Sequence, residues 1–176
     1  MRASAFAVAA ALCAVPAVAA AQNPVSDAYR GQTDRAARII TAALDMFPAD
    51  KWHYSPTPVQ MSVAAVAVHL VEEGNYLLCS RTTGMAEPQR TKVDTTASKE
   101  TLMAALRASF DFCHSSAMGL TDAQLADSSA GFGPRKFTKA AYVLITVGDW
   151  ADHYSQLANY LRLNNMVPPT ARRGNM

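Results

Sequence analysis

The chain has 176 residues, half of them hydrophobic, with 16 Lys and Arg against 14 Asp and Glu and a formal net charge of +2. This near-neutral balance, without a basic stripe, argues against nucleic acid as a partner. The length suits one domain with its own hydrophobic core and does not require a second domain.

The first 21 residues have the pattern of a secretory signal peptide. Arg2 is positive, an alanine-rich apolar run covers residues 5–20, and the small residues that follow suit cleavage. A membrane anchor is the weaker alternative, because the run is short and Pro16 interrupts it. We expect residues 22–176 to form one exported domain, periplasmic or secreted, with no stable membrane span after cleavage.

Four segments of this domain have apolar side chains spaced three or four residues apart, which is typical of amphipathic helices. No set of segments indicates a sheet. The predicted helices cover residues 26–46, 57–80, 98–118 and 138–164. The sequence therefore predicts an all-α fold.

Local signals mark several boundaries of these helices. Thr57, Pro58 and Gln60 have the pattern of a capping box at the start of the second helix, and residues 121–124 have the same pattern for a short extra turn after the third. We read residues 131–136 as an ordinary loop before the last helix. The core stripe of the second helix is expected to contain Val59, Val63, Val66, Leu70 and Leu77.

The connection between the second and third helices is long, polar and rich in threonine, from Arg81 to Ala97. Short links force neighbouring helices to be antiparallel, whereas a long crossover permits a parallel pair. We therefore predict a four-helix bundle in which helices 2 and 3 are parallel. That arrangement brings Cys79 and Cys113 to the same end of the bundle. In an oxidising compartment we favour a disulfide between them over two free thiols.

Polar side chains at the interior of two helices indicate a metal site. Asp149 and His153 are four residues apart on the last helix, so both side chains leave the same face. His69 lies in the middle of the second helix, at the edge of its core stripe. Two imidazoles and one carboxylate form a recognised divalent-metal arrangement that leaves positions open for water or substrate.

Two simpler interpretations stay open at this point. His69 alone could be a hydrogen-bonded core residue, and Asp149 with His153 could be an ordinary salt-bridged pair. The remaining histidines, His53 and His114, are expected in a loop and on a helix flank, outside any such site.

Two segments resemble the DinB-like superfamily of metal-dependent four-helix bundle proteins. Residues 57–80 have one histidine, His69, near mid-helix, and residues 149–169 contain Asp149 and His153 followed by a Tyr-Leu-Arg sequence and a Pro-Pro ending. The family pattern has one histidine in the second helix and a His-x-x-x-His pair in the last. The resemblance covers nearly all of the mature chain. It implies that His69 and His153 are metal ligands and that Asp149 replaces the usual middle histidine.

This resemblance implies that the protein binds a divalent metal ion. Compared with a site made of imidazoles alone, the carboxylate shifts the metal preference toward iron, manganese or zinc, and nickel is a further candidate. Family members include transferases and isomerases, so we expect a metal-dependent hydrolase or transferase of a small molecule, with Glu73 or Tyr154 as acid or base. The alternative is a non-catalytic bundle whose metal site has degenerated and which serves a structural or interaction role. Association into a homodimer is open.

Overall fold

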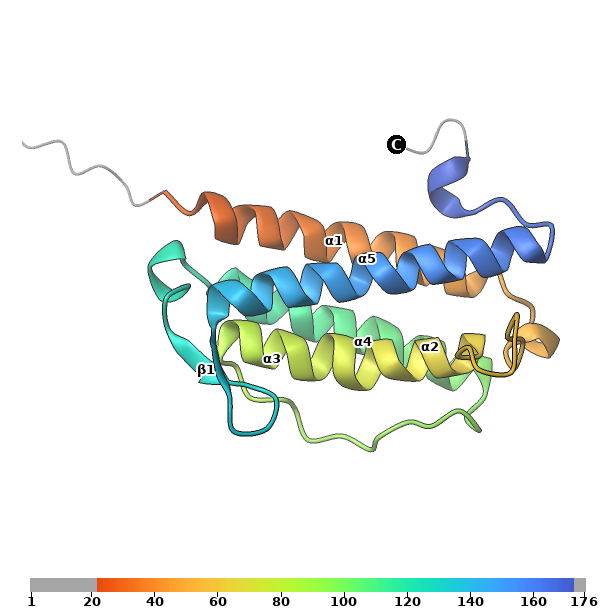
Figure 1. Ribbon diagram of the computed structural model, residues 1–176, viewed down its shortest axis with the longest axis horizontal. Helices are drawn as coiled ribbons and strands as arrows, with labels where there is room; N and C mark the ends of the chain where they lie inside the picture. Colours follow the sequence, from red (N-terminus) through yellow and green to blue (C-terminus); the bar gives the residue numbers. More distant parts are fainter. Residues whose placement is uncertain (1–21, 173–176) are drawn as a thin grey trace, which may run out of the picture.

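In the computed structural model, which describes residues 22–172, four helical columns run side by side (Figure 1). The predicted signal peptide, residues 1–21, lies outside the described residues. Among the residues described, no helix combines the length and the apolar character needed to cross a membrane. The columns are α1 (Pro24–Asp45), a composite of α2 (Val63–His69), the π-helix η2 (Leu70–Leu77) and α3 (Leu78–Thr83), then α4 (Lys99–Met118) and α5 (Lys139–Leu163).

The second column begins later than the capping-box pattern predicts. Thr57 and Gln60 close only a local turn, in which the Gln60 amide donates to the Thr57 carbonyl at 3.2 Å. The helix instead begins at Val63, because the Ser62 hydroxyl accepts from the Ala65 amide at 3.1 Å. The prediction that Val59 belongs to the core was therefore wrong, and its side chain is 94% exposed.

The predicted parallel arrangement of the second column and α4 is confirmed. Asn75 Nδ2 donates to Ser109 Oγ at 2.8 Å, and four residues further along each helix Cys79 forms a disulfide with Cys113. Equal steps in the same direction require parallel helices. The crossover between them runs along the outside of the bundle (Figure 1).

The crossover is attached to the bundle by Arg90. Its guanidinium lies 2.7 Å from the carboxylate of Glu72 and 3.8 Å above the ring of Tyr76. Glu72 also accepts a hydrogen bond from the Val93 amide at 3.0 Å. These contacts hold a long polar segment against η2, so it behaves as a strap rather than as a free loop.

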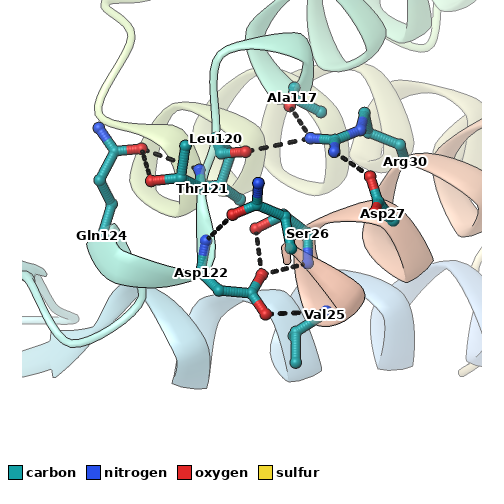
Figure 2. A network of polar contacts seen from close by, with 10 residues as sticks. Val25, Ser26, Asp27, Arg30, Ala117, Leu120, Thr121, Asp122 and Gln124 are labelled. Carbon is teal, nitrogen blue, oxygen red and sulfur yellow. Dashed lines mark hydrogen bonds and ion pairs between the residues drawn. The ribbon is translucent and has the colours of Figure 1, made fainter. Parts of the chain in front are cut away.

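A polar network joins the start of α1 to the turn after α4 (Figure 2). The predicted capping box is confirmed there, since the Thr121 amide donates to the Gln124 side chain at 2.9 Å around the 3₁₀ helix η3 (Asp122–Gln124). The Asp122 carboxylate accepts hydrogen bonds from the amides of Val25 and Ser26 at 3.1 and 2.8 Å. A carboxylate from one connection thus caps the first turn of α1.

A short hairpin, absent from the prediction, precedes α5. Strands β1 (Ser128–Ala130) and β2 (Lys136–Thr138) pair antiparallel, and residues 131–136, expected as a plain loop, contain the turn. Three-residue strands are too short to show an alternating pattern in sequence. The hairpin packs on α5 through its aromatic rings, with the Phe132 ring 6.2 Å from that of Tyr142.

Candidate metal centre

The structure brings His69, Asp149 and His153 together between the second column and α5. His69 Nε2 lies 3.1 Å and His153 Nε2 lies 3.5 Å from the same carboxylate oxygen, Asp149 Oδ1. The two imidazole rings are 4.4 Å apart, and one potential ligand atom from each residue lies within 4.8 Å of the others. His69 and Asp149, which are 80 residues apart in sequence, therefore meet at one point together with His153.

The local backbone explains this meeting. Asp149 and His153 are one turn apart on a single face of α5. His69 is the last residue of α2, immediately before η2, whose i to i+5 hydrogen bonds widen the helix. Such π-helical segments occur often at functional sites. The widening shifts the inward face, so that Leu77, predicted for the core stripe, is only half-buried.

Gly74 allows α5 to approach the second column at the site. A β-carbon added to Gly74 would lie 2.6 Å from Asp149 Oδ2, closer than real side chains come. Any larger residue at this position would force the carboxylate to move. Sequence reasoning did not identify Gly74, because its role depends on the distance between two helices and not on any pattern along one of them.

A second layer of polar groups fixes the orientation of both imidazoles. His69 Nδ1 lies 2.7 Å from Glu73 Oε2, and His153 Nδ1 lies 3.1 Å from Gln156 Oε1. Gln156 in turn donates to the Tyr160 hydroxyl at 2.8 Å. With both Nδ1 atoms occupied by acceptors, both Nε2 atoms face Asp149. This is the arrangement usual for metal-binding histidines.

The charge state of the cluster follows from its burial and its hydrogen bonds. Burial raises the pKa of Asp149, but hydrogen bonds and charge interactions with His153 and His69 outweigh that effect and lower it to about 2. The hydrogen bond to Asp149 raises the pKa of His69, and Glu73 adds to the same direction. Asp149 is thus an ionised carboxylate, although its side chain is only 18% exposed.

One atom of this carboxylate is unsatisfied. Asp149 Oδ2 is buried and has no hydrogen-bond partner within residues 22–172. Leaving such an oxygen without a partner costs about 1–3 kcal/mol or more for a charged group. Two imidazole nitrogens and an ionised carboxylate form a donor set that a divalent cation accepts. The residues present therefore fit a metal ion.

An open pocket of about 350 Å³ lies over the cluster. Its polar lining comes from His69, Glu73 and Asp149, and its remaining lining residues are apolar: Leu77, Leu78, Phe132 and Ile145. A site with this volume is large enough for a small organic molecule. Phe132 comes from the hairpin that the sequence analysis did not predict.

The other polar candidates lie elsewhere. His114 contacts Asp34 at 2.8 Å on an exposed flank, as predicted, and His53 is exposed in the loop before α2. The Tyr154 hydroxyl, proposed from sequence as an acid or base, donates to Thr170 Oγ1 at 2.8 Å near η4 (Pro169–Ala171). That prediction is corrected, because Tyr154 serves to attach the C-terminal segment. Glu73 alone of the pair contacts the cluster.

Comparison with known proteins gives one family and one fold. A family model described as the DinB superfamily matches residues 32–157, which include the whole cluster. A DinB-like protein from Bacillus subtilis has a similar structure, with a TM-score of 0.65 and 18% identity over 83% of this chain and 99% of that one. A DinB-like protein from Bacillus cereus has a TM-score of 0.67 and 18% identity, over 81% of this chain and 95% of that one. No curated protein matches the chain.

Proposed function

Because the chain belongs to the DinB superfamily, we propose that it binds one divalent metal ion through His69, Asp149 and His153 and acts as a metal-dependent hydrolase or transferase on a small molecule. The observation that carries this proposal is Oδ2 of an ionised Asp149, which is buried and has no hydrogen-bond partner in the described part of the chain, beside two imidazoles that both present Nε2. The donor set suits zinc, iron or manganese, and nickel belongs in any trial set.

The metal, when bound, would polarise a substrate oxygen or lower the pKa of a bound water or thiol. The chain supplies the other requirements. Glu73 lines the pocket, is 66% exposed and accepts from His69, so it is placed to take a proton from a nucleophile that enters from solvent. The apolar walls would contact the rest of the substrate and position it.

Metal analysis of the purified mature protein tests this proposal. We expect about one equivalent in the wild type after refolding with zinc, iron, manganese and nickel, and its loss in His153→Ala with the helical circular dichroism retained. The matched control is His114→Ala, because this histidine is exposed and its imidazole pairs with the exposed Asp34, away from the cluster. A wild type that retains none of the four metals would contradict the proposal and favour a non-catalytic bundle with a degenerate site.

We also infer that the protein is exported. The support is the signal-peptide pattern of residues 1–21 together with the disulfide between Cys79 and Cys113, since disulfides persist in oxidising compartments. Mass spectrometry of the protein isolated from its native cells should give a chain that begins at Gln22 and carries no free thiol. A chain that retains Met1 and has three titratable thiols, those of Cys13, Cys79 and Cys113, would contradict export.

A further inference from the structure

The pocket over the cluster has a polar end and an apolar end. On the second column His69, Glu73 and Leu77 follow one another at four-residue steps, and on α5 Ile145, Asp149 and His153 do the same. The two columns run antiparallel. Thr82 follows Leu77 along the second column, and its hydroxyl lies 3.0 Å from that of Thr146, which is next to Ile145 on α5. The cluster residues His69, Asp149 and His153 therefore gather at one end of the pocket. The apolar residues Leu77 and Ile145 lie at the other end.

The hairpin adds a third apolar wall. Phe132 lies at the hairpin turn and lines the pocket while 54% of it remains exposed. Its ring contacts those of Phe137 and Tyr142, both at 6.2 Å between centroids. The Tyr142 hydroxyl donates to the Ala130 carbonyl at 2.6 Å, which attaches the hairpin to α5. Phe132 is thus held in place as a surface against which a ligand can pack.

The charge of the lining restricts the ligand as well. Two carboxylates, Glu73 and Asp149, line the pocket, and none of its described lining residues is Lys or Arg. A divalent ion would balance these two negative charges, and none of the described lining residues at the apolar end offers a cation to pair with an acidic group on the body of a ligand. Placing an unpaired carboxylate against apolar walls is unfavourable because it loses its hydration.

From these three observations we propose that the pocket takes small molecules with one oxygen-donor head and an uncharged, apolar, ring-sized body. The head would lie toward His69 and Asp149, and the body between Ile145, Leu77 and Phe132. Ile145 and Phe132 then determine specificity. The position of the head rests on the metal binding proposed above, whereas the preference for an apolar body rests on the walls.

Three hydroxamates that share one metal-binding head test this preference. Acetohydroxamate has almost no body, benzohydroxamate has an apolar ring, and 4-carboxybenzohydroxamate has the same ring with a negative charge. Titration into the zinc-loaded protein should show benzohydroxamate binding about tenfold more tightly than acetohydroxamate, equivalent to about 1.4 kcal/mol. The added carboxylate should remove most of that gain.

Variants of the walls locate the effect. Ile145→Ser and Phe132→Ser should each reduce the benzohydroxamate preference to threefold or less, while acetohydroxamate affinity stays the same. Leu144→Ser is the matched control, because Leu144 is adjacent in sequence but 75% exposed and outside the pocket lining. It should keep the tenfold preference.

The outcomes separate the two proposals. Equal affinity of the wild type for acetohydroxamate and benzohydroxamate would overturn the inferred ligand class and leave the metal site standing. Tighter binding of the carboxylated probe would overturn it too. If a zinc-loaded protein bound none of the hydroxamates, the inferred ligand class would fail while zinc binding stood; if no zinc could be loaded, both proposals would fail.

Discussion

Replacement of Gly74 by alanine should damage the candidate metal site without unfolding the bundle. The added β-carbon would lie 2.6 Å from Asp149 Oδ2, whereas ordinary contacts begin at 3.4 Å, so the two must separate by about 0.8 Å. The other oxygen of the same carboxylate, Oδ1, contacts both histidines, so a movement of this size would disturb those contacts. Mutations that disturb the support of metal ligands typically cost 10- to 100-fold in metal affinity, and we expect a loss in that range.

The stability of the Gly74→Ala protein should change little. Alanine gains up to about 1 kcal/mol over glycine within a helix, and this gain offsets part of the strain of moving the carboxylate. Of the other atoms near the new methyl group, Leu70 Cδ2 lies at 3.5 Å, which is ordinary contact. We therefore expect a free energy of unfolding within about 1 kcal/mol of the wild type, measured by urea titration of the metal-free protein.

Isothermal titration of zinc into metal-free protein measures the expected loss. Gly31→Ala in α1 and Gly148→Ala in α5 are matched controls, because a β-carbon at either position meets no atom of the described residues within 4 Å. Both controls should bind zinc as the wild type does and gain some stability. The reasoning would be refuted if Gly74→Ala bound zinc with wild-type affinity, or if Gly31→Ala lost as much affinity as Gly74→Ala.

Four further outcomes follow from the same contacts. Glu73→Ala frees the His69 ring and should weaken zinc binding about tenfold; calorimetry that shows no change would contradict an orienting role. The double variant Cys79→Ala/Cys113→Ala opens a loop with a separation of 34 residues and should lose about 3–4 kcal/mol in urea unfolding, and a loss below about 1 kcal/mol would refute that estimate. Asn75→Ala removes the acceptor of a buried indole N–H at 2.7 Å and should cost about 2–3 kcal/mol by thermal unfolding, so an unchanged midpoint would show that the bond is dispensable. The pKa of Asp149 is lowered to about 2 from an ordinary 3.8, so the stabilising effect of the ionised carboxylate is complete above pH 4 and is lost as the pH falls toward 2. The metal-free wild type should therefore lose more stability over that interval than Asp149→Asn. Equal slopes of unfolding free energy against pH in the two proteins would contradict this.

Much of the bundle could be predicted because helix periodicity is a property of one segment at a time. The core stripe predicted for the second helix includes Val63, Val66 and Leu70, and all three are buried. The long crossover predicts the parallel pair that the disulfide then requires. The start of the second column was misplaced because the pattern at Thr57 does not reveal the contacts of the preceding loop with Val63 and Ala64, where the helix begins.

The candidate site was predicted in its three principal residues and not in its surroundings. Spacing on α5 and the family resemblance are enough to select His69, Asp149 and His153. Gly74 and Phe132 act through distances between separate elements, which no single segment encodes. The π-helix is a further reason, because the sequence analysis assumed 3.6 residues per turn throughout. That assumption assigns Leu77 to the core, whereas in the wider π-helix η2 its side chain lines the pocket.

Anomalous diffraction from a crystal of the zinc-loaded protein tests metal binding at this cluster most directly. We expect one peak about 2.0–2.2 Å from Nε2 of His69, Nε2 of His153 and a carboxylate oxygen of Asp149, with Glu73 and Gln156 still on the two Nδ1 atoms. A peak at another place in the molecule, or no peak after zinc loading, would contradict the assignment of these three residues as ligands.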